Sequence, residues 1–202
     1  MGKDTALDDQ QLTWKELKAE HLVQDRWIDF RRLTYEMPDG TVFTPFYSYS
    51  RRSYVVIVAT DEAGNYICVR QFRQGIREVT TEFPAGGIEN FGTTDYEQTD
   101  QMEDVLEAAK RELREETGYI SDQWEHLITV PSNATLADNY ACVFAARGCH
   151  KVSSQELDDT EFLNVRCVSP EELEQLIFTG KFQQAIHVMA WLLEKRTRTQ
   201  EM

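Results

Sequence analysis

The sequence predicts an α+β fold, with mixed or antiparallel strands, one helix in the middle of the chain and two helices at its end. Short β-branched and apolar runs separated by turn residues fill the chain up to residue 83. A glutamate-rich helix is expected near residues 100–118, and two further helices follow the last strand. The 202 residues suffice for one domain with a sizeable core and a small appendage.

Paired strands are expected in the first half of the chain. Residues 11–20 fit a short helix or a frayed arm. Five segments are predicted to be extended: 27–35, 41–49, 53–60, 66–72 and 80–83. The turn signals Pro38-Asp39-Gly40 and 61–65 join the first four of these segments into two hairpins. The polar, threonine-rich stretch 88–99 is expected to be a loop.

The second half begins with the glutamate-rich helix. Asp100 followed by Glu103 forms a near capping box at its start, and Gly118 is the expected stop. Three more strands are predicted near 124–130, 139–147 and 162–168. A helix then starts at Ser169-Pro170, with proline in its first turn, and breaks at Gly180. The last predicted element is an amphipathic helix over 183–195.

Composition restricts the classes of partner. The net charge of −14 argues against nucleic acid, because no basic patch is available to release phosphate counterions. The longest apolar run, around Val55 to Ala59, is far too short to span a bilayer. The polar N-terminal stretch lacks an apolar signal core, so a cytoplasmic protein with no membrane partner is expected. The four cysteines are scattered, which favours buried thiols over a disulfide framework or a zinc site.

Three glutamates crowd one side of the predicted middle helix: Glu112, Glu115 and Glu116. Like charges at this spacing repel each other by about 0.2–0.5 kcal/mol per pair. On a helical wheel Glu112 and Glu116 border the apolar stripe, whereas lysine and arginine occupy the water side. One interpretation is a solvated acidic face. The other is a hard divalent cation, since half-buried carboxylates require a compensating charge.

These residues resemble a known motif. The segment Arg111–Tyr119 is similar to the core of the Nudix box, G-x5-E-x7-R-E-U-x-E-E-x-G-U, in which U is an apolar residue. Glu103 stands eight positions before Arg111, as in that pattern, and Pro84-Ala85-Gly86 matches its first glycine. The segment between Gly86 and Glu103 is longer than the pattern allows. We assign the excess to the loop 88–99, because added loop length costs little free energy.

Further segments resemble the ADP-ribose pyrophosphatase branch of the Nudix family. They are Val69–Arg73, Glu82–Gly86, and Val168–Leu173 with Gly180-Lys181. The resemblance implies a Nudix α/β/α sandwich with a mixed sheet over residues 51–202. It also implies an N-terminal arm and β-hairpin over residues 1–50 that forms a homodimer, with an aromatic residue from this region stacking on adenine.

The activity implied is Mg²⁺-dependent hydrolysis of the diphosphate bond in a nucleoside diphosphate linked to another group, with Mn²⁺ as a substitute ion. The products would be a nucleoside monophosphate and a sugar phosphate. Segment 131–139 differs from the loop usual in this branch. ADP-ribose, another ADP- or GDP-sugar and a dinucleotide therefore all remain open as substrates.

The resemblance also implies site residues. The metal ligands would be the carboxylates of Glu112, Glu115 and Glu116 with the carbonyl of Ala85, oxygen donors that suit Mg²⁺. Arg111 would hold these carboxylates in place and not touch the substrate.

Three further candidates are less sharply defined. Arg73 could grip a phosphate with two N–H groups, and it fits a surface strand arginine equally well. Glu82 would bind a sugar hydroxyl or assist the metal site. A general base is expected from the loop over 155–162, with Glu161 as first choice and Asp159 as second. A solvated acidic loop is the alternative interpretation of this run.

Three other functions are weighed against hydrolysis. A Nudix-fold nucleotide sensor would bind without turnover, but the intact glutamates argue against it. Isoprenyl diphosphate isomerisation would need a cysteine with a matching acid in the cleft, and none is evident. An acidic interaction protein would leave the motif unexplained. The four isolated histidines show no metal-ligand spacing, so packing or surface roles are expected for them.

Overall fold

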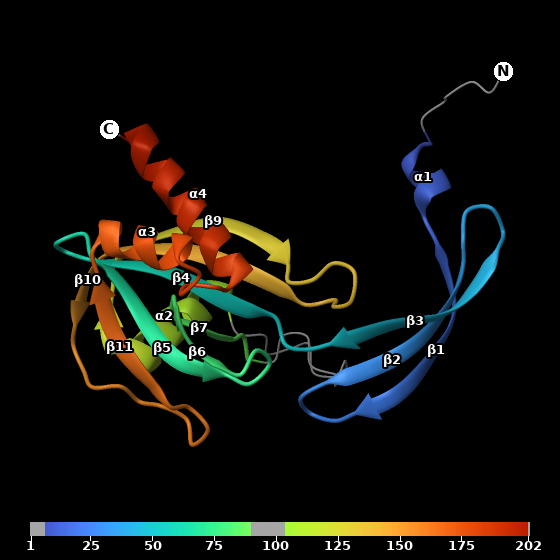
Figure 1. The fold of residues 1–202 in the computed structure, drawn as a ribbon, viewed down its shortest axis with the longest axis horizontal. Helices are drawn as coiled ribbons and strands as arrows, with labels where there is room; N and C mark the ends of the chain where they lie inside the picture. Colours follow the sequence, from blue (N-terminus) through green and yellow to red (C-terminus); the bar gives the residue numbers. More distant parts are fainter. Residues whose placement is uncertain (1–6, 90–103, 202) are drawn as a thin grey trace.

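A computed structural model describes residues 7–89 and 104–201 of the chain. Figure 1 shows a body of strands and helices from which a narrower N-terminal sheet projects. The helices are α1 (Asp9–Leu12), α2 (Val105–Thr117), α3 (Pro170–Phe178) and α4 (Ala185–Glu201). The strands are β1 (Lys15–Gln24), β2 (Asp29–Glu36), β3 (Val42–Ser50), β4 (Tyr54–Asp61), β5 (Tyr66–Arg73), β6 (Glu78–Glu82), β7 (Ala85–Gly87), β8 (Tyr119–Ile120), β9 (Gln123–Pro131), β10 (Tyr140–Lys151) and β11 (Leu163–Val168).

The body is built on a mixed eight-stranded sheet. Its main order is β11-β5-β4-β10-β8, with β6 paired to β5, β7 to β4 and β9 to β10. The β4–β10 pair is parallel and the remaining pairs are antiparallel. Strand β4 lies between β10 and β7: its residue Val56 pairs with Val143 on one side and with Ala85 of β7 on the other.

Helices cover both faces of this sheet. Alternate residues of β4 point to opposite faces, so Val55 and Ile57 pack in a core with Ala109 and Leu113 of α2. On the other face Val56 and Val58 pack with residues of α3 and α4, among them Leu173 and Trp191. This arrangement confirms the predicted α/β/α sandwich with a mixed sheet.

Most predicted strands and helices are present near their expected boundaries, but the prediction for residues 11–20 was wrong. Only a four-residue helix occurs, at Asp9–Leu12, and β1 follows from Lys15. Strand β1 pairs along β2 from Lys15↔Glu36 to Gln24↔Asp29, so the expected hairpin is a three-stranded sheet. Pairing with the next strand in the chain overrode a local sequence with no clear preference.

The predicted capping box of the middle helix, at Asp100 and Glu103, lies outside the described residues, as does most of the loop 88–99. The cap that the structure describes is Asp104, whose side chain accepts hydrogen bonds from the backbone N–H groups of Leu106 and Glu107. Aspartate is a favoured residue at this position because it satisfies N–H groups that have no partner within the helix.

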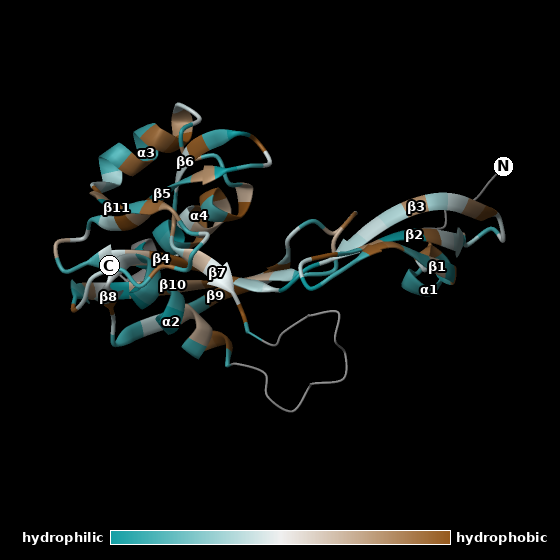
Figure 2. Cartoon of the chain, turned by 90° about the horizontal axis from the view of Figure 1, so that it is seen from below, coloured by the Kyte–Doolittle hydropathy of each residue, from teal (hydrophilic) through white to brown (hydrophobic). Residues whose placement is uncertain are grey.

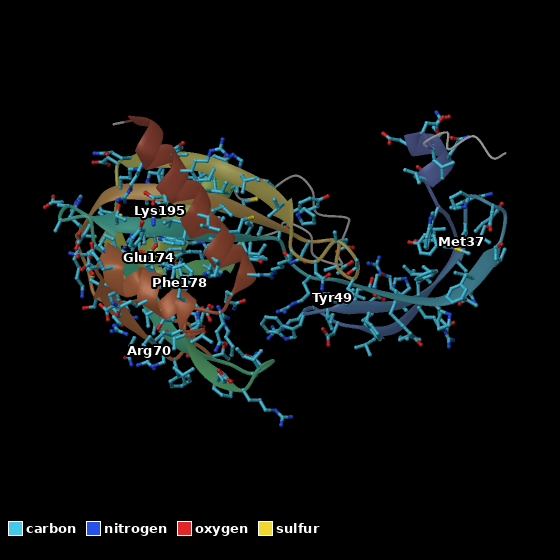
Figure 3. All side chains as sticks on the ribbon, turned by 45° about the horizontal axis from the view of Figure 1, so that its top comes forward. Met37, Tyr49, Arg70, Glu174, Phe178 and Lys195 are labelled. Carbon is cyan, nitrogen blue, oxygen red and sulfur yellow. The ribbon has the colours of Figure 1, made fainter. Side chains whose placement is uncertain are left out.

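The N-terminal sheet is joined to the body at one end. In Figure 3 the labelled Tyr49 lies where this sheet meets the body, and its backbone N–H donates to Leu136 O at 2.8 Å. Arg31 Nη2 of β2 donates to Ser50 Oγ at 2.7 Å and to Asp138 Oδ2 at 2.9 Å. The rest of the sheet extends away from the body (Figures 1 and 2).

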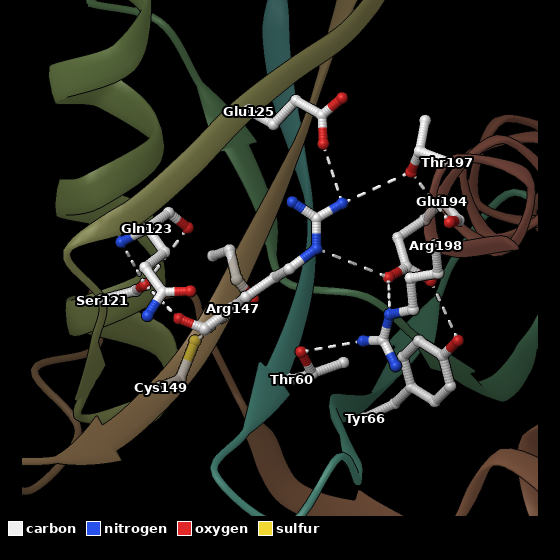
Figure 4. Close-up of polar contacts among 11 residues, drawn as sticks. Thr60, Tyr66, Ser121, Gln123, Glu125, Arg147, Cys149, Glu194, Thr197 and Arg198 are labelled. Atoms are coloured by element: carbon white, nitrogen blue, oxygen red, sulfur yellow. Dashed lines mark hydrogen bonds and ion pairs between the residues drawn. The ribbon is translucent and has the colours of Figure 1, made fainter. Parts of the chain in front are cut away.

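Helix α4 is fastened to the body through a buried carboxylate, Glu194, shown in Figure 4. Its Oε2 accepts a hydrogen bond from the Tyr66 hydroxyl at 3.0 Å, and its Oε1 forms an ion pair with Arg198 Nε. Arg147 Nε lies 4.0 Å from the same Oε1, and Arg147 Nη2 donates to Glu125 at 2.7 Å. At the surface, Lys195 of α4 pairs with Glu174 of α3 (Figure 3).

A membrane span is not seen in the described part of the chain, since no helix there is both long and apolar enough to cross a bilayer.

Candidate active site

Helix α2 presents the glutamates to β7. Ala108, Ala109 and Leu113 are fully buried against the sheet, and this sets the rotation of the helix about its axis. Glu112 and Glu116 flank that stripe and are themselves buried, with 7 % and 3 % of their surface exposed. The helix ends at Gly118, which adopts the left-handed conformation (φ 76°) and donates its N–H to Arg114 O.

Gly86 allows the backbone of β7 to approach Glu112. A Cβ at position 86 would lie 2.0 Å from the carboxyl carbon of Glu112. Any larger residue would therefore displace the carboxylate. The first glycine of the motif thus has a physical role here, because it leaves room for the carboxylate of Glu112, 26 positions further along.

Glu116 faces the neighbouring residue of the same strand. Its Oε2 accepts a hydrogen bond from the backbone N–H of Ala85 at 3.0 Å. Ala85 is held in turn by its pairing with Val56 of the central strand β4. The carboxylate is therefore tied to the rigid sheet, which is how a binding side chain is held in one geometry.

Arg111 connects the glutamates to each other and to β7. Its Nη1 donates to Glu112 Oε1 at 2.8 Å and to Glu115 Oε2 at 3.0 Å. Its Nη2 donates to the carbonyl of Gly87 at 3.0 Å. These contacts are the ones that a residue holding the carboxylates would make. Glu115 is more open, with its side chain 37 % exposed.

The negative charges of Glu112 and Glu116 are buried with few positive or donor groups to offset the cost of burial. Burial raises the pKa of Glu112 to about 7, although the charge and hydrogen bond of Arg111 act in the opposite direction. Burial and the charge of Glu112 raise the pKa of Glu116 well above its ordinary value, against the hydrogen bond from Ala85. A buried carboxylate in this condition gains from a nearby cation.

The residues fit a hard divalent ion by their donor chemistry. The predicted ligands lie together where α2 meets β7, all donors are oxygen, and Gly86 keeps the backbone clear of Glu112. The carboxylates are nevertheless directed at protein N–H groups. Within residues 7–89 and 104–201, no three acidic, histidine or cysteine side chains are arranged to hold a metal ion. Arg111 and Ala85 bind the oxygens that such an ion would take, so the glutamate side chains would have to turn.

Arg73 and Glu82 contact each other. Arg73 Nε lies 2.9 Å from Glu82 Oε1 and Nη2 lies 2.6 Å from Oε2, so two donors of the guanidinium already hold a carboxylate. Glu82 is fully buried and also accepts from Thr80 Oγ1. Burial tends to raise the pKa of Glu82, but the hydrogen bond and charge of Arg73 outweigh it, and the pKa is lowered. Arg73 is thus a partly exposed strand arginine, 33 % exposed, whose guanidinium is held by a buried carboxylate.

Glu161 lies close enough to the two buried glutamates for their charges to interact. Its negative charge contributes to the raised pKa of both Glu112 and Glu116. Its own Oε2 accepts from the backbone N–H of Asp158 at 3.1 Å, and its N–H donates to Asp158 O at 2.9 Å. Asp159 is exposed in the same turn. The structure thus brings Glu161 toward the motif and leaves Asp159 at the surface.

One residue near the site was missed by sequence reasoning. His187 of α4 is buried, and its Nδ1 accepts the backbone N–H of Phe83 at 3.1 Å, just before Pro84 and Ala85. No spacing signal could have revealed this contact, because it joins residues more than a hundred positions apart. The expectation of a packing role for the histidines holds for His187.

Comparison with known proteins agrees with this geometry. The family model for the NUDIX domain matches residues 50–192. An ADP-ribose pyrophosphatase of Bacillus subtilis is 28 % identical over 164 residues, covering 81 % of this chain and 82 % of the relative. A methanol dehydrogenase activator of Bacillus methanolicus matches with the same identity and coverage.

A solved structure described as an ADP compounds hydrolase superposes with a TM-score of 0.75 over 98 % of each chain. At 20 % sequence identity, this likeness bears on the fold alone. The family match and the placement of the glutamates on α2 together support one conclusion. The chain belongs to the Nudix family and is a Nudix hydrolase, the class of enzyme that the glutamate motif predicted.

Proposed function

We propose that this protein hydrolyses the diphosphate bond of a nucleoside diphosphate linked to another group, most favourably ADP-ribose or a related nucleotide sugar. The products are a nucleoside monophosphate and a sugar phosphate. The observation that carries the proposal is the pair Glu112 and Glu116, buried against β7 without full charge compensation. The name of the Bacillus subtilis relative supports the choice of ADP-ribose.

We assign the metal ligands to Glu112, Glu115, Glu116 and the carbonyl of Ala85, with Mg²⁺ as the ion and Mn²⁺ as a substitute. When bound, such an ion neutralises phosphate charge and lowers the pKa of a coordinated water. Arg111 keeps Glu112 and Glu115 at fixed positions on the helix through its two short contacts. Because Arg111 also holds the Gly87 carbonyl, it aligns α2 with β7.

Glu161 is assigned as the general base, with Asp159 as the second choice. The charge of Glu161 acts on Glu112 and Glu116, which supports placing its carboxylate near the metal ligands, where it would take a proton from the attacking water. We assign Arg73 and Glu82 a joint role: Glu82 orients the guanidinium, and the N–H groups of Arg73 that Glu82 leaves available would bind a phosphate or sugar oxygen.

The test is phosphate release, coupled to a phosphatase, from ADP-ribose, nucleotide sugars, dinucleotides and nucleoside triphosphates with and without Mg²⁺. Wild type is run beside Glu115→Gln and Glu116→Gln. Glu107→Gln is the matched control, because Glu107 lies on the outer face of the same helix with its side chain 63 % exposed. Mg²⁺-dependent turnover that collapses in the first two variants and persists in the control is expected.

A nucleotide sensor is the alternative function. Saturable binding of ADP-ribose by the folded wild type, with no turnover of any compound in Mg²⁺, would replace hydrolysis by sensing.

We also propose that residues 1–50 are a dimerisation region and residues 51–202 the catalytic domain, so that the protein is a homodimer. The three-stranded sheet, coloured by hydropathy in Figure 2, and the residue before it carry several exposed apolar side chains. They include Trp14, Leu17, Val23, Val42, Phe43 and Tyr47, each more than 40 % exposed. A small sheet needs a covered face to be stable, and a second copy of the chain would supply it.

Sedimentation at micromolar concentration tests the dimer. The expected mass is twice the chain mass of 23.5 kDa. Phe43→Glu places a charge in the aromatic cluster of Phe43 and Phe46 and should shift the mass to that of one chain. Leu192→Glu is the control, since Leu192 is equally exposed but lies on α4 in the body. A wild type of single-chain mass would overturn the proposed dimer.

A further inference from the structure

The C-terminal end of α2 is completed by a distant segment of the chain. The last carbonyls of a helix have no partners within it. Here the backbone N–H of Glu156 donates to Glu115 O at 2.9 Å, and Gln155 Nε2 donates to Glu116 O at 2.7 Å. Segment 152–156, which follows β10, therefore caps the turn that carries Glu115 and Glu116.

Gly118 allows this segment to approach so closely. Its carbonyl accepts from the N–H groups of Val152 at 2.8 Å and Ser153 at 3.3 Å. A Cβ on Gly118 would lie 2.2 Å from the backbone oxygen of Ser153. The glycine of the motif is needed both for its positive φ and for this contact. The segment is thus held against α2 by four hydrogen bonds, one of them from a side chain.

The same segment leads directly to Glu161. After Gln155 and Glu156 the chain forms the turn at Asp158, whose N–H holds the Glu161 carboxylate. That carboxylate acts electrostatically on Glu112 and Glu116. The chain between the cap and Glu161 is only a few residues long, so the point at which it is fastened to α2 sets where Glu161 can reach.

We propose that Gln155 is a positioning residue that places Glu161 against the glutamates of α2, an inference that rests on the hydrolysis proposed above. Glu116 is held at both ends: its carboxylate by Ala85 N–H and its carbonyl by Gln155 Nε2. Gln155 thereby ties the loop of the base to the residue whose carboxylate would bind the metal. Gln155 itself touches neither a ligand nor the reacting atoms.

The first test replaces the donor and keeps its size. In Gln155→Glu a carboxylate would face the Glu116 carbonyl at the negative end of the helix dipole, so the contact becomes repulsive. Gln155→Lys keeps an N–H donor that suits a helix C-terminus and should rescue the contact. Gln175→Glu, an equal change at an exposed position of α3, is the matched control.

We expect Gln155→Glu to lower kcat roughly tenfold with KM changed by less than about threefold, because a small misplacement of the base slows the chemical step more than binding. Gln155→Lys and the control should remain within about threefold of wild type by the same argument. A Gln155→Lys variant as slow as Gln155→Glu would show that the donor is not what matters.

The second test asks whether Gln155 acts through Glu161. In a Glu161→Gln background, adding Gln155→Glu should lower kcat by less than about twofold, because residues that act as a unit are non-additive. A full tenfold further loss would overturn the coupling and leave Gln155 a merely structural role.

A third readout does not depend on turnover. Hydrogen exchange at the Glu156 amide should be at least tenfold faster in Gln155→Glu than in wild type, since that amide is protected by the same cap. An unchanged exchange rate at the Glu156 amide would show that the Gln155 hydrogen bond does not hold this segment against α2. Absence of turnover in wild type would instead overturn the proposed hydrolysis, so the two failures are distinguishable.

Discussion

Two regions of this molecule bury glutamates, and they treat the charge in opposite ways. On α4, Glu194 is fully buried and is met by the Tyr66 hydroxyl, by the ion pair with Arg198 and by the nearby Arg147 (Figure 4). On α2, Glu112 and Glu116 are almost as buried, yet Glu112 is contacted by Arg111 and Glu116 by the backbone N–H of Ala85. Burial raises the pKa of both.

The difference separates a structural carboxylate from one reserved for function. A buried charge surrounded by partners holds two elements together, although its net contribution to stability is modest. A buried charge with too few partners destabilises the fold and is retained where a ligand later supplies the missing charge. The two regions should therefore respond oppositely to loss of the buried carboxylate.

The largest expected effect is on activity at α2. Glu116→Gln keeps the hydrogen bond from Ala85 but removes the charge, and it should lower kcat by roughly 10²–10³-fold. The same change should raise the free energy of unfolding by about 1 kcal/mol in EDTA, because a poorly compensated charge is removed. Turnover and urea unfolding of one preparation measure both. A variant that is both inactive and destabilised would break the comparison.

The reverse pattern is expected on α4. Glu194→Ala leaves two arginines and a tyrosine without their shared partner and should lower the free energy of unfolding by about 3 kcal/mol. Its kcat, measured below the unfolding transition, should stay within about twofold of wild type. Glu125→Gln, which alters only the half-exposed rim of the same network, should cost less than about 1 kcal/mol. Equal losses in the two variants would contradict a central role for Glu194.

His187 lies between the two regions and predicts a pH dependence. Burial lowers its pKa from 6.5 to about 4, with the charge of Glu82 acting in the opposite direction. Between pH 4 and 6.5, His187 is therefore protonated in the unfolded chain and neutral in the folded chain. The contribution of neutral His187 to the free energy of unfolding should be fully present above pH 6.5. It should fall as the pH drops toward 4, by about 2 kcal/mol at pH 5.

Urea unfolding at a series of pH values measures this contribution, with His187→Asn as the control. Asparagine can still accept the Phe83 N–H but does not titrate, so its variant should lose this component of the pH slope. An identical slope in wild type and His187→Asn would assign the acid sensitivity to other groups.

The smallest expected effect tests the space around Glu112. Gly86→Ala would push against the carboxyl end of a flexible side chain, so the loss of stability should be below about 1 kcal/mol. Displacing that carboxylate should still lower kcat about tenfold. Gly118→Ala is the contrasting variant: its Cβ meets a backbone oxygen at a positive φ, so stability should fall by more than about 1 kcal/mol. Similar losses of stability in Gly86→Ala and Gly118→Ala would show that contact with a side chain and contact with the backbone cost the same.

The elements with strong local signals were predicted well. Alternating apolar residues and turn residues located β2 to β5, and the apolar stripe with Gly118 located α2. The prediction for the segment before β2 was wrong, because β1 is defined by its partner and none of its residues is buried. At the site, the motif placed Glu112, Glu115 and Glu116 on one helix, but the ion pair of Arg73 with Glu82 could not be read from a chain without its sheet register.

The sequence by itself determined the family and the helix that carries the glutamates, and it predicted an oxygen-binding cation as their ligand, because these inferences depend on residue identity and on the period of a single helix. Only the tertiary structure decided how far each glutamate is buried, which N–H groups hold it, and that segment 152–156 caps α2. It also decided that Glu194, with no motif around it, joins α4 to the sheet. These features arise from contacts between residues distant in the chain, and local sequence carries no record of such contacts.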